Sequence, residues 1–486
     1  MASDMPDNLE AERRLKARDE LFWQEQERKI QGALGQPCCT LSGISAGLIK
    51  MSGHFAVVVH GEDECASCFR HIGPSTVNFF CTGLTEREFV TGETAEPLRR
   101  CLRLVAAEVA PDAIFVLGAC PVEVIGDRFE TVVAAVGLEY PDIPMIAMHT
   151  SGLKVGSQSA MLDWMFSTLA SLPVRPPSDD GWFRQLGYVG YGLYSAAVDG
   201  DAPQLDTLLR HVAVAPVVPE RDTCINLIGA PKRSAGSGQF PEYERIAAAA
   251  GLRVLSNYPH AASLHKWRAV KFARASFVVD RSLYPKFIGV LEAAGQDVVE
   301  VPLPTGVAQT ETFYRAIGRA TGREAQIEAA IAEPRDRAAA MLEKFRARYG
   351  GLKVALGMRM VNNYEADQVA FHGLGDYLAL AEFGFDITVL VQGPPDKHEK
   401  FQKMFDNRGI RFPFEMFADP WMLSDHLSAG KFDVAYLADH CRPEARKAGV
   451  PMIAGRDLAA WFEGVGDNVE HVERTLSQAL KRGGAA

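Results

Sequence analysis

Short apolar runs rich in β-branched residues recur along this chain, and a longer segment with helical periodicity follows each of them. This alternation is typical of parallel α/β sheets, whose strands are buried on both faces beneath covering helices. The pattern starts afresh near residues 55, 224 and 353. We therefore predict an α/β protein with three parallel sheets. The runs are FAVVVH (55–60), AIFVLGA (113–119), PMIAMH (144–149), CINLIGA (224–230), RVLS (253–256), SFVVD (276–280), DVVEVP (297–302), KVALGM (353–358), ITVLVQ (387–392), DVAYLA (433–438) and PMIAG (451–455).

The three restarts predict three tandem Rossmann-like domains. Pro-rich segments at 172–181 and 215–222 are typical of connectors between the first two domains. A long helical stretch rich in Ala, Glu and Arg, from about residue 323 to 349, precedes the third. The predicted divisions are an N-terminal helical segment (1–30), a first domain that carries the candidate cysteines (31–215), a second domain (216–350) and a third domain (351–486).

Charge and hydropathy exclude several classes of protein. The net charge of −10 over 486 residues argues against a nucleic-acid binder, which needs clustered Lys and Arg. No run approaches the roughly 20 apolar residues of a membrane span, and the charged N-terminus has no apolar signal core. We expect a cytoplasmic protein. Its nine cysteines would then stay reduced, which makes metal binding the question to ask of them.

Two cysteines share one setting at the end of a predicted strand. Cys65 follows FAVVVH, and Cys120 follows AIFVLGA and precedes Pro121, a residue favoured in the first turn of a helix. Backbone N–H groups at a helix start favour the thiolate that iron requires. Strand-end loops of one parallel sheet also meet at its carboxyl edge. We interpret Cys65 and Cys120 as metal ligands, and interpret the remaining isolated cysteines as small apolar core residues: Cys81, Cys101, Cys224 and Cys441.

Zinc is the alternative metal, because Cys65 and Cys68 form a C-x-x-C pair. No second C-x-x-C completes a tetrahedral site, and a strand-end His such as His60 is more often a hydrogen-bonding residue than a ligand. An iron–sulfur cluster is therefore favoured over zinc. The adjacent Cys38 and Cys39 leave the first ligand ambiguous, and Cys68 stays an additional candidate.

The order of Cys39, Cys65 in HGEDEC and Cys120 in GACPVEVIGDRFE resembles the large subunits of nitrogenase component 1. The segments 82–102 and 148–164 are also similar to stretches of that family. The resemblance implies that Cys39, Cys65 and Cys120 hold a subunit-bridging iron–sulfur cluster, either P-cluster-like [8Fe-7S] or [4Fe-4S]. These motifs cover about the first third of the chain, and the remainder matches in its three-domain architecture.

The same resemblance implies partners. A homologous sister subunit would complete a heterotetramer, and a separate ATP-hydrolysing iron–sulfur reductase would deliver electrons to reduce a small-molecule substrate. In agreement, the chain has no G-x-x-x-x-G-K-[ST] phosphate loop. The Gly-rich segment 229–238 lacks the Lys-Ser/Thr ending and is interpreted as a loop near an anionic site. No membrane and no nucleic acid is expected among the partners.

The departures from the family bear on activity. Nitrogenase catalytic subunits hold their large cofactor through a Cys in the middle unit and a His in the last, but the comparable segments here, 276–285 and 451–458, have neither. Three hypotheses follow. The first is reductive cleavage of carbon–sulfur bonds in methylthio-alkanes, with a second complex iron–sulfur cofactor in the assembly. The others are a dark-operative tetrapyrrole (protochlorophyllide or chlorophyllide) reductase and a nitrogenase cofactor-assembly scaffold.

No catalytic residue can be assigned from the sequence. Polar residues after predicted strands are candidates for a second cluster or a substrate, because α/β proteins build sites at that edge. Lys266, Arg268 and Arg359 would either offset the charge of an anionic cluster or be solvated loop cations. The other candidates are His260, His265, Asn362, His440 and Cys441.

Overall fold

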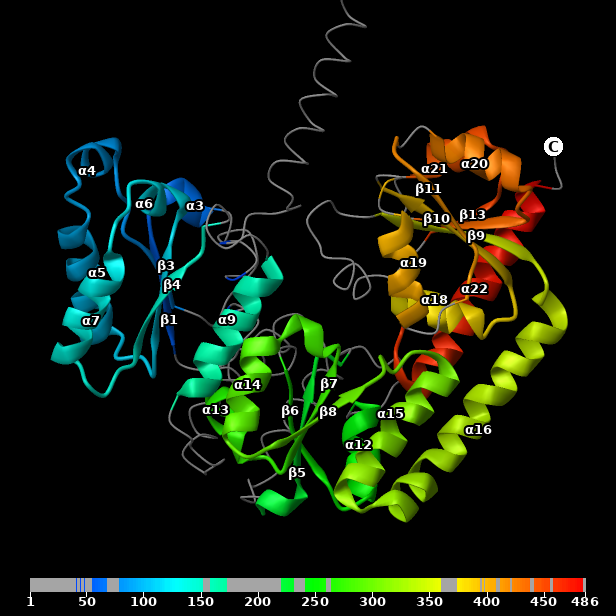
Figure 1. Cartoon of the computed structure of the whole chain (residues 1–486), viewed down its shortest axis with the longest axis horizontal. Coiled ribbons are helices and arrows are strands. Elements are labelled where there is room, and N and C mark those ends of the chain that lie inside the picture. Colours follow the sequence, from blue (N-terminus) through cyan, green and yellow to red (C-terminus); the bar gives the residue numbers. More distant parts are fainter. Residues whose placement is uncertain are drawn as a thin grey trace, which may run out of the picture.

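The chain forms three parallel sheets joined in sequence, as Figure 1 shows for the computed structural model. Two sheets have four strands and the third has five, and every strand pair is parallel. The predicted fold class is therefore confirmed. The structure describes residues 41, 44, 48, 55–67, 78–151, 158–172, 220–230, 241–258, 264–359, 374–393, 396, 398–407, 411–419, 422–437, 441–454 and 458–483.

The first sheet has the strand order β2-β1-β3-β4. Its central strands β1 and β3 are buried along their whole length, because neighbouring strands flank them and apolar side chains cover both faces. The edge strand β4 alternates buried and half-buried residues. The elements are β1 (Ala56–His60), α3 (Asp63–Ser67), β2 (Asn78–Cys81), α4 (Glu86–Thr91), α5 (Ala95–Glu108), β3 (Ile114–Gly118), α6 (Cys120–Val124), α7 (Phe129–Glu139), β4 (Met145–His149) and α9 (Gln158–Ser171).

The second sheet has the order β6-β5-β7-β8 and is followed by the predicted long helix, α16. Pro334 lies inside α16 without ending it. The elements are β5 (Cys224–Ile228), α12 (Glu242–Ala249), β6 (Arg253–Tyr258), α13 (Leu264–Ala269), β7 (Ala275–Val279), α14 (Pro285–Ala293), β8 (Asp297–Val301), α15 (Gly306–Thr321) and α16 (Glu324–Tyr349), with short 3-10 turns at 221–223, 270–272 and 281–283.

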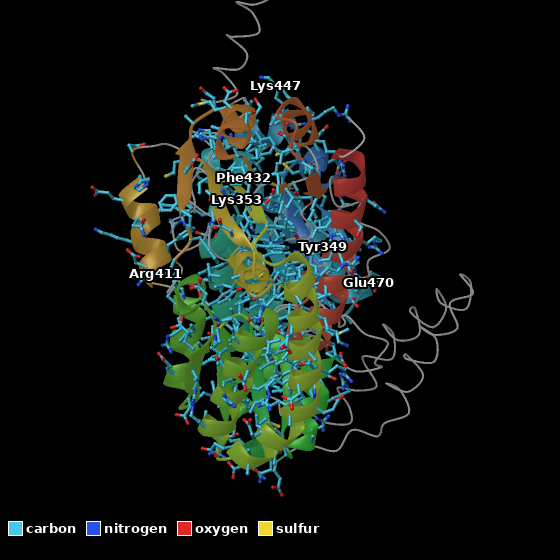
Figure 2. The ribbon with its side chains drawn as sticks, turned by 90° about the vertical axis from the view of Figure 1, so that its right-hand side faces the viewer. Tyr349, Lys353, Arg411, Phe432, Lys447 and Glu470 are labelled. Carbon is cyan, nitrogen blue, oxygen red and sulfur yellow. The ribbon has the colours of Figure 1, made fainter. Side chains whose placement is uncertain are left out.

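The third sheet has the order β11-β10-β9-β12-β13. Its last helix, α22, packs on both α15 and α16 of the preceding unit, and Figure 2 labels Tyr349 at the end of α16 and Glu470 on α22. The elements are β9 (Lys353–Arg359), α18 (Leu374–Ala381), β10 (Asp386–Gln392), α19 (His398–Asn407), β11 (Phe414–Phe417), α20 (Met422–Gly430), β12 (Val434–Leu437), α21 (Arg442–Lys447), β13 (Met452–Ala454) and α22 (Trp461–Gly483).

Each unit has an apolar cluster of its own, and two larger clusters span neighbouring units. One apolar cluster joins the first and second sheets, where Phe166 of α9 stacks on Trp267 of α13 with ring centroids 4.9 Å apart. Another joins the second and third sheets through α15, α16 and α22. The three sheets fall within the three predicted domains, and the boundaries themselves stay a prediction. Among the described residues, no helix is long and apolar enough to cross a membrane.

Candidate functional site

Cys65 and Cys120 follow neighbouring strands of the first sheet. β1 and β3 pair in parallel with His60 opposite Gly118, so both chains leave the sheet at the same edge. Cys65 is the third residue of α3, and Cys120 is the first residue of α6 with Pro121 after it. The predicted succession of strand, cysteine and helix is confirmed at both positions, and Figure 1 shows α3 and α6 at the same end of the sheet.

The two turns that lead to these cysteines touch each other. The backbone N–H of Ala119 donates to the carbonyl of His60 over 3.0 Å. A Cβ placed on Gly61 would lie 2.6 Å from the Cβ of Ala119, so only glycine allows this approach. Both thiols are half-exposed. The edge thus carries two half-exposed cysteines on segments that are held against one another.

Other predicted site residues lie outside the described part of the chain. These include Cys39, the third proposed ligand, so the full ligand set is not assembled here. Nothing can be said of the side chains of His265 and Arg359 either, although their backbones belong to α13 and β9. The residues wholly outside the description are Cys38, Cys39, Cys68, His260, Asn362 and His440.

Cys81 lies at the same edge, which the sequence did not indicate. It ends β2, a short strand that was not predicted, and its side chain is half-exposed instead of buried. Its Sγ donates to the carbonyls of Gly61 and Glu62, at 3.5 and 3.4 Å. Cys81 packs against an apolar cluster, as expected of a core residue, and its sulfur also faces the turn that leads to Cys65.

The remaining described cysteines lie on other elements of the fold. Cys224 begins β5 and is fully buried, and burial raises the pKa of its thiol to about 11. Cys101 is half-buried on α5, and burial, with the nearby Cys81, raises its pKa to about 11 as well. Burial therefore disfavours the thiolate form at both positions. Cys441 precedes α21 in the third unit and packs against an apolar cluster there.

Two acid–histidine pairs lie at this edge. The ring of His60 contacts Asp127 and Thr82, as expected of a hydrogen-bonding strand-end histidine. His149, at the end of β4, lies with Nδ1 3.3 Å from the buried Glu123 of α6. Sequence reasoning missed Glu123, His149 and Asp127, although two of them lie in the segment CPVEVIGD that follows β3. The two acidic residues of this segment, Glu123 and Asp127, were the sequence signal that could have pointed to the pairs.

Two of the candidate cations, Lys266 and Arg268, are less exposed to solvent than the side chains of a surface loop would be. Arg268 is buried, and its Nη2 donates to the carbonyl of Asp112 over 2.8 Å, which links the second unit to the first. Burial lowers the pKa of Lys266 despite the nearby Glu244. The structure therefore gives Arg268 a role in packing between units.

An iron–sulfur cluster is compatible with the donor set at this edge. Cys65 and Cys120 would supply thiolates from two adjoining turns, and Cys39 would be the third ligand. A cluster held there provides one-electron transfer. The described residues alone contain no group of three or more His, Cys, Asp or Glu side chains arranged to hold a metal ion. A complete site therefore requires ligands from beyond them.

The middle unit does not fit the cofactor ligation of catalytic nitrogenase subunits. β7 ends at Val279, and the next residue is Asp280, with a left-handed backbone at φ 65°. Its carboxylate accepts from the backbone N–H of Ser282 over 3.1 Å and closes the turn locally. No cysteine stands in this comparable segment, as the sequence indicated.

Fold and site together define a class: a three-sheet α/β protein with cysteines at the carboxyl edge of its first sheet. The family model described as nitrogenase component 1 type oxidoreductase matches residues 39–456, and the chain belongs to that family. Its members are oxidoreductases that bind iron–sulfur clusters.

Individual relatives are distant. The nitrogenase iron-molybdenum cofactor biosynthesis protein NifE of Rhizobium meliloti (strain 1021) is 24% identical over 393 residues, which cover 77% of this chain and 69% of NifE. The solved structure described as "Nitrogenase Cp1 at pH 6.5" superimposes with a TM-score of 0.61 at 15% identity, covering 92% of this chain and 93% of the other. The same protein at pH 5 gives a TM-score of 0.59 at 16% identity, covering 90% of this chain and 88% of the other. These structural matches establish the fold.

Proposed function

We propose that this chain is one subunit of a nitrogenase-like reductase and that Cys39, Cys65 and Cys120 hold an iron–sulfur cluster shared with a homologous subunit. The observation that carries the proposal is the placement of Cys65 and Cys120 on two touching turns at one sheet edge. A P-cluster-like [8Fe-7S] or a [4Fe-4S] cluster matches thiolate ligands contributed by two chains. Its role is to relay electrons to the site of reduction.

Exposed apolar residues beside Cys120 support a partner at this edge. Val124 and Ile125, at the end of α6, are 68% and 44% exposed. Large apolar side chains in water beside a proposed cofactor are typical of a surface that another protein covers. We propose that the sister subunit and an ATP-dependent iron–sulfur reductase approach this end of the first sheet, forming a heterotetramer that receives electrons from the reductase.

The substrate is proposed from what the middle unit lacks. Asp280 follows β7 in the segment where catalytic nitrogenase subunits carry a cysteine, which argues against dinitrogen reduction through the usual ligand. We propose reductive cleavage of the carbon–sulfur bond of methylthio-alkanes, with a second complex iron–sulfur cofactor elsewhere in the assembly. Tetrapyrrole reduction is the enzymatic alternative.

A second candidate function has a specific observation behind it. The curated relative NifE is a cofactor biosynthesis protein, and its similarity spans 77% of this chain. In that case the chain would be a scaffold on which a cofactor is assembled, and its cluster edge would serve assembly instead of turnover.

The test is anaerobic purification of the full chain with the subunit that accompanies it, followed by iron and sulfide analysis and electron paramagnetic resonance. We expect Cys39→Ala, Cys65→Ala and Cys120→Ala each to lose the bridging-cluster signal. Cys101→Ala is the matched control, since that thiol packs on α5 against the opposite face of the sheet, and it should keep the wild-type signal. A wild-type complex without iron, or with zinc in its place, would contradict the proposal.

The iron count separates the candidate functions. Two results together support the carbon–sulfur reductase. The complex would hold more iron than one bridging cluster, with part of it surviving the three substitutions, and it would release a thiol from a methylthio-alkane. A single cluster lost in all three variants, together with turnover of a tetrapyrrole, supports the pigment reductase. The scaffold function is supported if the complex turns over neither substrate but transfers a cofactor to an apo-nitrogenase.

A further inference from the structure

His60 is the last residue of β1, and its side chain is fully buried. A buried imidazole needs partners for both ring nitrogens. Nδ1 lies 3.2 Å from Oγ1 of Thr82, and Nε2 lies 3.1 Å from Oδ2 of Asp127. Because a carboxylate can only accept, Nε2 carries a hydrogen and donates it to Asp127. One ring thus joins the segment after β2 to the segment after α6.

Asp127 is fixed to the end of the helix that begins with Cys120. Its backbone N–H donates to the carbonyl of Val122 over 3.0 Å. Burial raises the pKa of Asp127, but hydrogen bonds from His60 and Thr94 outweigh it, so the pKa lies below its usual value. Asp127 is therefore a carboxylate at neutral pH, and its hydrogen bond with His60 is charge-assisted.

The other side of His60 reaches the turn that leads to Cys65. The backbone N–H of Gly61 donates to Oγ1 of Thr82 over 3.0 Å, and Nδ1 of His60 meets the same oxygen. The carbonyl of His60 meanwhile accepts from Ala119, the residue before Cys120. Both cysteine-bearing segments are thus tied to one residue, at its ring and at its backbone.

We infer that His60 and Asp127 are positioning residues that hold Cys120 at a fixed place relative to Cys65. The inference rests on the proposed function, since the fixed placement serves a cluster bound by both thiolates. Groups behind metal ligands typically set how firmly a metal is held and which electronic state it shows. Losing this pair should therefore change the cluster while leaving both thiols in the chain.

The experiment compares His60→Phe and Asp127→Asn with wild type in the anaerobically purified complex. Phenylalanine fills the buried space without either hydrogen bond, so we expect iron loss to a ferrous chelator to be roughly 10- to 100-fold faster and the paramagnetic resonance line shape to change. Asparagine keeps an oxygen that accepts from Nε2, so Asp127→Asn should lie closer to wild type. His426→Phe is the matched control, because His426 pairs with Glu415 over 2.8 Å in the third unit. It should match wild type.

Amide hydrogen exchange of the metal-free chain gives a second measure that needs no cluster. We expect the amides at the end of α6 and directly after it, from Val122 to Gly126, to exchange faster in His60→Phe and in Asp127→Ala. Wild-type exchange in both variants, or a wild-type iron-release rate and line shape in His60→Phe, would overturn the inference and leave the proposed function standing. A wild-type complex that binds no iron would overturn the proposed function, and the inference with it.

Discussion

Gly61 is the residue at which the spacing of the two cysteine turns is most sensitive. Its neighbour across the edge, Ala119, leaves no room for a side chain, since an added Cβ would sit 2.6 Å from the alanine methyl. Both partners are backbone-proximal atoms, so a rotamer change cannot relieve the clash. One methyl group here would act directly on the distance between the segments carrying Cys65 and Cys120.

We predict that Gly61→Ala destabilises the chain by about 1–3 kcal/mol, the usual cost of overpacking, and lowers its iron content. Denaturant unfolding and iron analysis of the same preparation provide the check. Gly289→Ala in α14 is the control, because its Cβ would meet open space and alanine favours a helix by about 0.5–1 kcal/mol. Equal iron in both variants would refute the argument.

At the residue scale, sequence alone predicted where Cys65 and Cys120 lie because each directly follows an apolar run. It did not predict the partners of those segments. His60 and Asp127 are separated by 67 residues, and His60 and Thr82 by 22. Local pattern carries no information on which distant polar groups meet, so neither this network nor the Glu123–His149 pair could be foreseen.

At the scale of elements, the buried carboxylates of Asp163 and Glu242 and the half-buried carboxylate of Glu382 each cap a helix that belongs to another part of the chain. Asp163 of α9 accepts from the first amides of α14, Glu382 from those of α15, and Glu242 of α12 from those of α22. A carboxylate satisfies the unpaired N–H groups there and suits the positive end of the helix. Burial still raises the pKa of all three, despite these hydrogen bonds.

Glu242 shows the consequence most clearly. Burial raises its pKa from 4.5 to about 7, against hydrogen bonds from Glu463, Phe462 and Tyr314. Between these two pH values the folded chain keeps a proton that the unfolded chain releases. The stability contribution of this site is therefore fully present below pH 4.5 and is lost as the pH rises towards 7.

We predict that Glu242→Gln removes this pH dependence, because the neutral amide oxygen still accepts from the α22 amides. Relative to wild type, the variant should gain up to about 3 kcal/mol between pH 4.5 and pH 8, at 1.36 kcal/mol per pKa unit. Urea unfolding across that range measures it. Glu399→Gln, at an exposed first-turn glutamate of α19, is the control. Parallel stability curves for wild type and Glu242→Gln would contradict the expectation.

The elements themselves were predictable to the degree that they are buried. All eleven expected runs became strands, and the fully buried ones, such as β1, β3, β5 and β7, have continuous apolar runs. The short edge strands β2 and β11 were missed, since NFFC is half-buried throughout and FEMF contains an exposed glutamate. Edge strands need less apolar sequence, so their pattern does not stand out from loops.

At the scale of the whole molecule, two apolar clusters cross the predicted domain boundaries. Phe166 of the first unit contacts Trp267, Tyr284 and Phe287 of the second. Cutting the chain between the predicted first and second domains would expose this aromatic cluster on both sides. The sequence indicated three repeats of one architecture, but periodicity within a unit cannot show which faces it shares with the next.

We predict that fragments 1–215 and 216–486 do not fold separately into soluble, protease-resistant units. Near-ultraviolet circular dichroism and limited proteolysis of each fragment, alone and mixed, test this. Wild-type near-ultraviolet signals from the isolated fragments would show that the junction is dispensable. Recovery only on mixing would confirm that the aromatic cluster is one core.

The cap on α14 also has a consequence for biosynthesis. Asp163 and the amide of Phe287 that it binds are 124 residues apart. At about 5–20 residues per second, the ribosome reaches Phe287 roughly 6–25 seconds after it has added Asp163. Throughout that interval the apolar side of α9 has emerged without its covering helix. Yield in a foreign host should therefore depend on chaperones that shield this helix, and slower growth at low temperature alone would lengthen the exposure.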